Sequence, residues 1–415
     1  MIALACLALA AWIYLIAFHG LFWRSTPVLL IRQLNTVAVP HPFLRLLRER
    51  VGKQCHSFLA ISIADAAPSG QARVAIVVPA RDEAAGIRPC LDSLLAQDYA
   101  GPLSVILVDD NSSDGTAQIA ASLAASRSAG ERLTVLSGKP LPPGWSGKLW
   151  AVHQGLAHPA AQAADYVLLT DADIVHAPQH LSRLIAKAES EQLDLVSEMV
   201  RLHCSTFAER ALIPAFVFFF QMLYPFAWVA NPARRTAGAA GGTMLVSRAA
   251  LSRICGVERI RRHLIDDCAL AKEIKSTGGR IWLGHAEDTV SLRVYPSPKD
   301  IWDMIARTAY VQLEHSPLLL LGCIAAMGVI YCAPPLLALG ADGLARVLGL
   351  LAWLLMALAF QPTLRRYRCS PAWGLALPAI GLFYLCATVA SAIRHHAGHG
   401  GGWKNRVYPG QPRNG

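Results

Sequence analysis

Charged residues are scarce in this chain of 415 residues: Asp, Glu, Lys and Arg make up 16%, while hydrophobic residues make up 54%. Such a balance is too apolar for an ordinary water-soluble enzyme. The ten cysteines include no Cys-x-x-Cys pair, which argues against a zinc site or a disulfide framework and favours a reduced compartment. No internal repeat occurs either, so the chain is not a repeat array.

The apolar excess lies at the two ends of the chain. Residues 1–23 contain no Lys, Arg, Asp or Glu and are long enough to span a bilayer. A cleaved signal peptide is the rival interpretation, but the basic n-region is missing and the apolar stretch is too long, so we predict an uncleaved anchor. Residues 317–340, 344–364 and 371–393 predict about three further transmembrane helices within 316–395.

The net charge of +10 could indicate nucleic acid as a partner. Much of it flanks apolar segments, which favours anionic lipid headgroups instead, so we expect a membrane and no nucleic acid. The juxtamembrane linker 24–71 and the cluster Arg365-Arg366-Tyr367-Arg368 are basic and should stay cytoplasmic. Four spans then place the central region in the cytoplasm and both termini outside. The tail 396–415 is also basic, and this conflict leaves open a re-entrant C-terminal segment.

The central region, residues 72–315, alternates short β-branched runs with amphipathic stretches. This pattern predicts an α/β fold with a mostly parallel sheet. In open α/β sheets, ligands bind beyond the carboxyl ends of the strands. The predicted strands are 74–78, 103–108, 133–136 and 166–169, and the predicted helices are 84–97, 114–127 and 147–157.

Polar side chains follow three of these strands. Asp171-Ala-Asp173 is the most informative case, because residues i and i+2 of an extended chain point the same way and unpaired buried carboxylates are costly. A divalent cation with a diphosphate would resolve that cost, whereas a lone Asp-x-Asp is more often a polar strand exit. The other two strands deliver their own groups to the same edge. They are Pro79, Arg81 and Glu83 after the first strand, and Asp109 and Asp110 after the second.

Three later features could complete a site. Gly144-Trp-Ser-Gly-Lys148 precedes a helix and could hold phosphate oxygens, although it matches no phosphate-loop fingerprint. Gly238-Ala-Ala-Gly-Gly-Thr243 allows close backbone approach to a ligand. Asp266 and Asp267 open an amphipathic helix: they are either partners of the helix dipole, or Asp267 is a general base.

Two membrane-proximal features remain. Residues 207–230 are apolar and aromatic, and we prefer an interfacial helix to a transmembrane one because a span would put the flanking segments on opposite sides of the bilayer. Arg307 precedes the second span, where it either clamps a diphosphate or marks the positive-inside flank. Arg307 and Tyr310 are expected to share a helix face.

Taken together, these blocks resemble the family 2 glycosyltransferases, with their GT-A nucleotide-sugar (Rossmann-like) fold, from about residue 74 to residue 312. Within that family they are similar to the membrane-bound hopene-associated glycosyltransferases. The motifs behind the narrower resemblance are Val78-Pro-Ala-Arg-Asp-Glu83, Trp145-Ser-Gly-Lys-Leu-Trp150, Leu169-Thr-Asp-Ala-Asp-Ile174, Ile265-Asp-Asp-Cys-Ala-Leu270, Ala306-Arg-Thr-Ala-Tyr-Val-Gln-Leu313 and the basic Trp403-Lys-Asn-Arg406.

The resemblance implies roles for several residues. Glu83 and Asp110 would contact the nucleoside, expected to be uridine, and Asp171 would lie by the ribose and diphosphate. Asp173 would ligate Mg²⁺ or Mn²⁺, and Asp267 would deprotonate the acceptor hydroxyl. The chain lacks the Trp of the Gln-x-x-Arg-Trp pattern found in processive relatives, because Arg307-Thr-Ala-Tyr310 stands there. This departure argues against long-chain polymerisation.

The predicted function is therefore an inverting hexosyltransferase that moves a sugar from a nucleotide-diphosphate sugar to a lipid, with a hopanoid as the expected acceptor. Its catalytic domain would face the cytoplasm at a bacterial inner membrane. One alternative is transfer to another lipid, such as a carotenoid, a diacylglycerol or a polyprenyl phosphate. The other is a non-catalytic membrane scaffold that binds nucleotide sugars.

Overall fold

The computed structural model describes residues 1–24, 72–126, 130–398, 402–403 and 406–407. The predicted linker 24–71 lies outside the described residues after Arg24. Most of the predicted tail 396–415 lies outside them as well.

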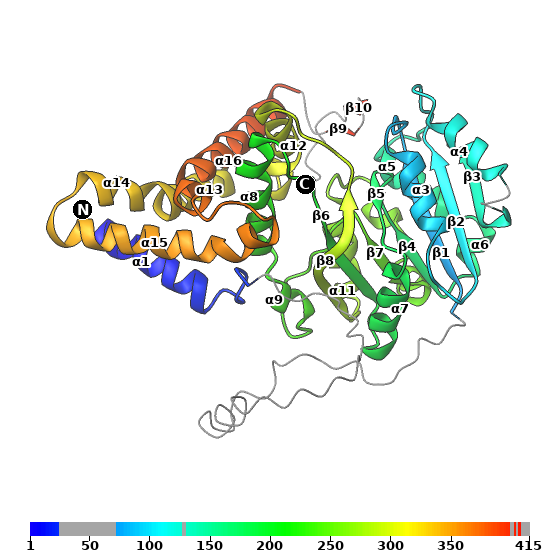
Figure 1. Cartoon of the computed structure of the whole chain (residues 1–415), viewed down its shortest axis with the longest axis horizontal. Helices are drawn as coiled ribbons and strands as arrows, with labels where there is room; N and C mark the ends of the chain where they lie inside the picture. The colour runs from blue at the N-terminus through cyan, green and yellow to red at the C-terminus, as the bar shows by residue number, and fades with distance from the viewer. Residues whose placement is uncertain (25–71, 127–129, 399–401, 404–405, 408–415) are drawn as a thin grey trace, which may run out of the picture.

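An eight-stranded mixed sheet forms the domain on the right of Figure 1, in the order β3-β2-β1-β4-β7-β6-β8-β5. The first four strands in this order run parallel to one another. β7 is antiparallel to both β4 and β6, β6 is parallel to β8, and β8 is antiparallel to β5. The strands are β1 (Val74–Ala80), β2 (Leu103–Asp109), β3 (Leu133–Ser137), β4 (Tyr166–Leu169), β5 (Ile174–Val175), β6 (Leu195–Arg201), β7 (Met244–Ser247) and β8 (Ile281–Ser291).

Helices cover both faces of the sheet, so strands such as β1 are buried along their whole length. One face packs on an apolar cluster that includes α3 (Ile87–Leu95), α4 (Thr116–Ala124) and α7 (His180–Ser190). The other face packs on α5 (Gly147–Leu156), α6 (Pro159–Gln162), α10 (Arg248–Arg253) and α11 (Asp266–Ser276). The short 3₁₀ segments are Gly130–Arg132 and Glu258–Ile260. The predicted α/β fold is confirmed. The sheet as a whole is mixed, and its parallel part consists of β1 to β4, the four strands predicted from the sequence.

A close approach fixes α5 on the sheet. A Cβ atom at Gly155 would lie 2.4 Å from Cγ1 of Val77 on β1, so only glycine fits there. The N-terminal end of α5 thereby reaches the carboxyl ends of β1 and β4, which is where the polar side chains gather.

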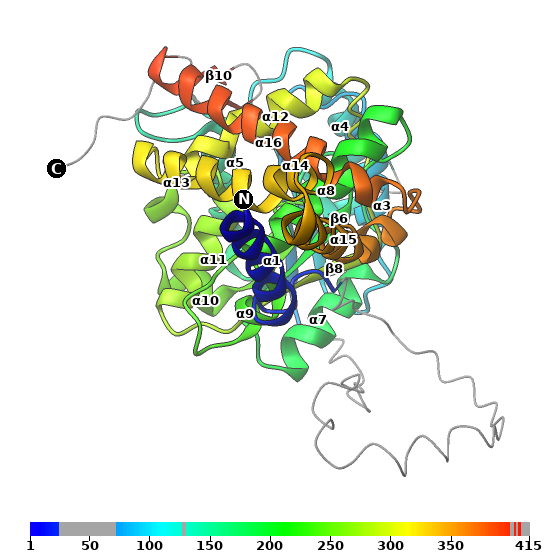
Figure 2. The same ribbon diagram turned by 90° about the vertical axis from the view of Figure 1, so that its left-hand side faces the viewer.

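A helical bundle forms the other half of the molecule, on the left of Figure 1, and Figure 2 looks at it with the sheet domain behind. Its helices are α1 (Ile2–Ala17), α8 (Phe207–Leu223), α9 (Phe226–Ala230), α12 (Pro298–Gln312), α13 (Pro317–Met327), α14 (Ala333–Gly340), α15 (Gly343–Arg366) and α16 (Trp373–His396). A π-helical turn, Gly328–Cys332, joins α13 to α14.

Among the described residues, four helical segments are long and apolar enough to cross a membrane: Phe207–Ala230, Pro317–Gly340, Gly343–Arg366 and Trp373–His396. The last three are the C-terminal segments predicted from the sequence. The N-terminal helix is apolar as predicted, but α1 ends at Ala17, six residues before the end of the predicted anchor. At 1.5 Å per residue its 16 residues extend about 24 Å.

The segment predicted to be interfacial, residues 207–230, is broken at Tyr224 and Pro225 into α8 and α9. In Figure 1, α8 stands between the bundle and the sheet and runs across the direction of α1 and α15. In the most apolar part of the segment Phe207–Ala230, 56% of the residues are buried inside the protein. Much of the apolar surface of this segment therefore faces other parts of the protein rather than lipid.

The two halves share one apolar core. Trp12 of α1, Phe218 of α8 and Met244 of β7 all belong to the same buried cluster. The sheet and the bundle are also joined by an ion pair, between Glu287 of β8 and Arg366 of α15 at 3.1 Å. The bundle is therefore packed against the sheet domain and not merely tethered to it.

Candidate functional site

The loops that leave β1 and β2 are tied to each other. Arg81 Nη1 donates to the carbonyl of Asp110 at 2.5 Å and lies 3.7 Å from its carboxylate. The backbone N–H of Glu83 donates to Thr116 Oγ1 at 2.8 Å. Hydrogen bonds therefore link the two loops at one edge of the sheet. Three of the residues predicted at these strand ends lie there: Arg81, Glu83 and Asp110.

Asp109 ends β2 and is 7% exposed. Its Oδ2 accepts a hydrogen bond from the backbone N–H of Ser112 at 3.2 Å. Its Oδ1 is buried with no hydrogen-bond partner among the described residues. A buried acceptor without a donor costs free energy, but this oxygen is enclosed by the protein, so the structure does not expose it to a ligand.

The paired acids after β4 bind different cations. β4 ends at Leu169, so the extended geometry expected for Asp171 and Asp173 does not reach them. Asp171 Oδ1 lies 2.9 Å from Lys148 Nζ, whereas Asp173 Oδ2 lies 2.8 Å from Arg293 Nε. The assumption that both acids point the same way from a straight strand was therefore wrong.

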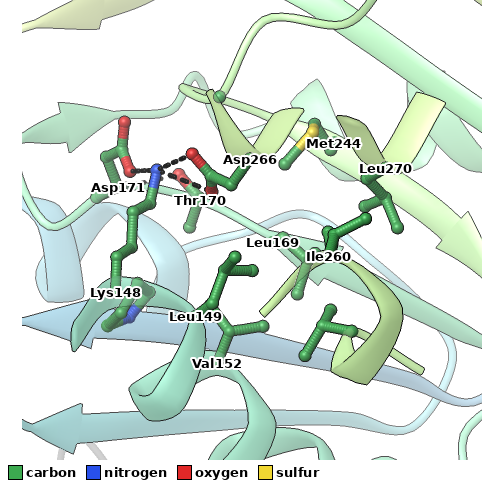
Figure 3. A pocket seen from close by; sticks show the side chains of 13 residues that line it. Lys148, Leu149, Val152, Leu169, Thr170, Asp171, Met244, Ile260, Asp266 and Leu270 are labelled. Carbon is green, nitrogen blue, oxygen red and sulfur yellow. Dashed lines mark hydrogen bonds and ion pairs between the residues drawn. The ribbon is translucent and has the colours of Figure 1, made fainter. Parts of the chain in front are cut away.

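Lys148 joins the paired acids to the start of α11. Ser146 caps the N-terminus of α5 by accepting from the N–H of Leu149, and this cap orients the first turn that carries Lys148. Figure 3 shows Lys148 reaching between Asp171 and Asp266, whose nearest carboxylate oxygens lie 2.9 Å and 3.1 Å from its Nζ. Burial alone would lower the pKa of Lys148, but these two carboxylates raise it above its usual range, so the amine is charged.

Asp267 lies next to this cluster. Its Oδ2 accepts the backbone N–H of Gly241 at 2.8 Å. A Cβ atom at Gly241 would stand 3.3 Å from that oxygen and 3.5 Å from Lys148 Nζ, which explains the small residue there. Burial, together with the neighbouring Asp266 carboxylate, raises the pKa of Asp267 to about 6. A carboxylate with that pKa can accept a proton near neutral pH.

The pocket in Figure 3 lies between these groups and the apolar side chains of the sheet. Pro79, at the end of β1, lines it beside Lys148, Asp171 and Asp266. The predicted residues Pro79, Lys148 and Asp171 therefore meet at one pocket with Asp266, the neighbour of the predicted Asp267 on α11. The dipole interpretation of Asp266 and Asp267 is incomplete, because Asp266 also pairs with Lys148 and Asp267 with Gly241.

Arg293, which the sequence analysis missed, completes the opposite side of the edge. It follows β8, and its Nη2 lies 2.9 Å from Glu83 Oε1 while its Nε contacts Asp173. Burial alone would lower its pKa, but Asp173 and Glu83 raise it. The only sequence signal was an arginine two residues beyond a strand, which many arginines share.

Arg307 is exposed on α12, while Tyr310, one turn later, is 1% exposed. Both residues lie on α12 three positions apart, so they are neighbours on the helix surface as expected, although their burial differs. Burial raises the pKa of Tyr295, and the positive charges of Arg293 and Arg307 act against that rise. Arg307 thus lies near Tyr295, two residues beyond Arg293.

The carboxylates at this edge fit a hard divalent cation. Oxygen donors are what Mg²⁺ and Mn²⁺ take, and Asp173 supplies them directly before β5. Among the described residues no three His, Cys, Asp or Glu side chains converge to hold a metal ion. A metal here would therefore depend on ligand oxygens and water for most of its coordination, as expected for a cation bound together with a diphosphate.

Comparisons with known proteins identify a family match and a shared fold. Residues 75–255 match the family described as Glycosyl transferase family 2. The structure is similar to that of the mannosyltransferase PcManGT from Pyrobaculum calidifontis, solved in complex with GDP-Man and Mn²⁺, with a TM-score of 0.50 and 18% identity over 94% of this chain and 98% of that chain. That likeness shows the fold and confirms the predicted GT-A architecture.

Two other solved structures align over less of the chain. Glucosyl-3-phosphoglycerate synthase from Mycobacterium tuberculosis gives a TM-score of 0.36 with 19% identity over 59% of this chain and 79% of that chain. Mannosyl-3-phosphoglycerate synthase from Rubrobacter xylanophilus gives 0.33 with 19% identity over 54% and 68%. No curated protein matches the chain significantly.

Proposed function

Residues 75–255 form a glycosyltransferase family 2 domain and the protein is a glycosyltransferase; from this premise we propose that it transfers a sugar from a nucleotide-diphosphate sugar to a membrane lipid, with inversion at the anomeric carbon. One observation carries the proposal. Lys148 links Asp171, on the donor side, to Asp266 beside Asp267, whose pKa of about 6 suits a base. A donor site and a proton acceptor thus lie side by side.

The nucleoside would bind at the ends of β1 and β2. Glu83 and Asp110 offer carboxylates there, braced by Thr116 and Arg81. Asp109, the last residue of β2, would lie beside the ribose. The resemblance of the sequence favours uridine, whereas PcManGT was solved with GDP-Man, so both UDP and GDP sugars belong in any test.

Asp173 would hold Mg²⁺ or Mn²⁺ together with the donor diphosphate. Such a cation, when bound, supplies a Lewis acid that neutralises charge on the departing diphosphate. Lys148 is a second cation beside Asp171, and Arg307 is a third candidate. These residues bind and orient the diphosphate while the sugar carbon faces α11.

Asp267 would act as the base. As the acceptor oxygen bonds to the anomeric carbon, the bond from that carbon to the diphosphate oxygen breaks, and the acceptor proton passes to Asp267. The hydrogen bond from Gly241 fixes the carboxylate for this step. One in-line displacement inverts the anomeric centre and needs no covalent enzyme intermediate.

The acceptor would come from the membrane. We propose that α1 and the segments from α13 to α16 anchor the chain, that residues 72–315 form the cytoplasmic catalytic domain, and that α8 lies at the interface of a bacterial inner membrane. The four apolar segments and the shared core support this arrangement. A hopanoid is the proposed lipid. A carotenoid, a diacylglycerol or a polyprenyl phosphate is the alternative.

The test is incubation of membranes containing the full-length protein with radiolabelled UDP- and GDP-sugars and Mn²⁺, with and without added hopanoids. A labelled glycolipid that requires hopanoids supports the proposal. A glycolipid formed equally without them shows another lipid acceptor. Donor binding with neither transfer nor hydrolysis would instead favour the binding scaffold.

A further inference from the structure

Arg293 connects two acids that arrive from different strands. Glu83 follows β1 and Asp173 follows β4, and the guanidinium lies 2.9 Å from the first and 2.8 Å from the second. These are the acids expected to lie at the nucleoside and at the metal. Arg293 therefore occupies the position between nucleoside and metal, where a donor diphosphate has to lie.

The guanidinium of Arg293 has N–H groups that its contacts with the two acids do not use. Its contacts with Asp173 and Glu83 use Nε and Nη2, and arginine has five N–H donors in all. The side chain is 38% exposed, while the two carboxylates are 15% and 12% exposed. The cation is thus reachable from solvent, whereas the acids that orient it are mostly enclosed.

The loop that carries Arg293 does not need this side chain to hold it. The backbone N–H of Leu292 donates to the carbonyl of Asp173 at 2.8 Å. The N–H of Tyr295 donates to Glu209 Oε1 at 2.8 Å. Backbone hydrogen bonds on both sides of Arg293 already anchor the loop. The guanidinium also compensates the two mostly enclosed carboxylates, and its exposed part leaves N–H groups open to a ligand.

We propose that Arg293 is a binding residue for the diphosphate of the sugar donor, an inference that rests on the proposed function. Glu83 and Asp173 aim the guanidinium, and its remaining N–H groups donate to phosphate oxygens, a geometry that arginine matches well. Arg293 then shares with the divalent cation the neutralisation of the diphosphate. Part of the affinity for a nucleoside diphosphate should consequently persist without metal.

The experiment measures binding of UDP, GDP, uridine and guanosine to the full-length protein in detergent, in Mn²⁺ and in EDTA. For Arg293→Ala we expect the affinity for the nucleoside diphosphate to fall about tenfold to a hundredfold in EDTA, because charge-assisted bonds to phosphate are lost. In Mn²⁺ the loss should be smaller. Affinity for the free nucleoside should not change, and Arg293→Lys should lie between the two.

Arg253→Ala is the matched control. Arg253 is also 38% exposed and pairs with an aspartate, Asp194, at 3.2 Å, but it belongs to α10 and not to the site. It should bind every ligand as the wild type does.

Other results would overturn the inference. Equal losses for nucleoside and diphosphate would show that Arg293 only holds the loop. A loss confined to Mn²⁺ would show that it acts through Asp173, and unchanged affinity would remove any role. If the wild type binds neither UDP nor GDP, the proposed function itself fails. Thermal unfolding of each variant checks that it is folded.

Discussion

The donor edge of the sheet and the helical bundle are built from opposite kinds of residue. At the donor edge, charged groups follow apolar strands, and each finds a specific partner, as Lys148 does with Asp171. In the bundle, the contacts are apolar, such as the packing of Phe218 against Phe360. Charged groups at the ends of buried strands indicate a ligand site, because a buried charge needs a partner. An apolar helix indicates only that its surface is buried, either in protein or in lipid.

The largest expected effect separates chemistry from binding. We predict that Asp267→Asn lowers transfer by about a hundredfold to ten-thousandfold, because the acceptor proton loses its base. Binding of the nucleoside diphosphate should be retained, since the change keeps the shape of the side chain. Transfer of labelled sugar and titration of UDP and GDP measure the two separately. Glu273→Gln, on the same helix, is the control. Full activity of Asp267→Asn removes the base assignment.

The next prediction tests the metal. Asp173→Ala should lower the affinity for a nucleoside diphosphate in Mn²⁺ by about tenfold to a hundredfold, because the proposed protein ligand is lost. In EDTA the affinity should not fall, since a negative charge has been removed from a site for an anion. Asp92→Ala, an exposed ion-pair residue on α3, is the control. Unchanged affinity in Mn²⁺ would contradict the ligand role.

A smaller effect concerns pH. The positive charge of Lys148 lowers the pKa of Asp267 against the effects of burial and Asp266. A base acts as the carboxylate, so wild-type kcat/KM should fall as the pH drops below about 6. Lys148→Met removes that charge and should move the fall upward by about one pH unit. Lys272→Met, an exposed lysine of α11, should leave the profile in place. A profile that is identical in Lys148→Met would show that Asp267 is not the titrating base.

The smallest effect probes where the two regions meet. Glu209 of α8 is 0% exposed and accepts backbone N–H groups from Tyr295 and Thr206 at 2.8 Å and 3.0 Å. Glu209→Gln should reduce the free energy of unfolding by about 2 kcal/mol, because hydrogen bonds to a charged group are lost.

Denaturant unfolding in detergent measures this change. Glu287→Gln is the control, because Glu287 also joins the sheet to the bundle, through Arg366, but is 47% exposed. Its effect should stay within about 1 kcal/mol. Equal effects of the two variants would mean that the buried contact of Glu209 does not join the regions.

The donor edge could largely be predicted from the sequence. The carboxyl ends of parallel strands share one edge, so chain order alone brings Glu83, Asp110 and Asp171 together. What failed there was local geometry. β4 ends at Leu169, and the turn that follows gives Asp171 and Asp173 different cations. Propensity and periodicity do not determine a turn of this kind.

Arg293 could not be predicted because its position depends on long-range pairing. β8 reaches the paired acids by pairing with β6 and β5, and nothing in the local sequence around Arg293 encodes those partners. In the bundle the C-terminal helices were predicted, and two details were missed for another reason. An apolar run indicates burial, but neither the end of α1 at Ala17 nor the place of α8 against its neighbours follows from apolarity alone.

The most direct test of the central claim is a structure of the full-length protein with Mn²⁺ and a nucleoside diphosphate. The account predicts the nucleoside at Glu83 and Asp110, and the diphosphate between Asp173 and Lys148. The face toward Asp267 should remain open for an acceptor. A nucleotide bound elsewhere, or one whose diphosphate points away from Asp173 and Lys148, would contradict it.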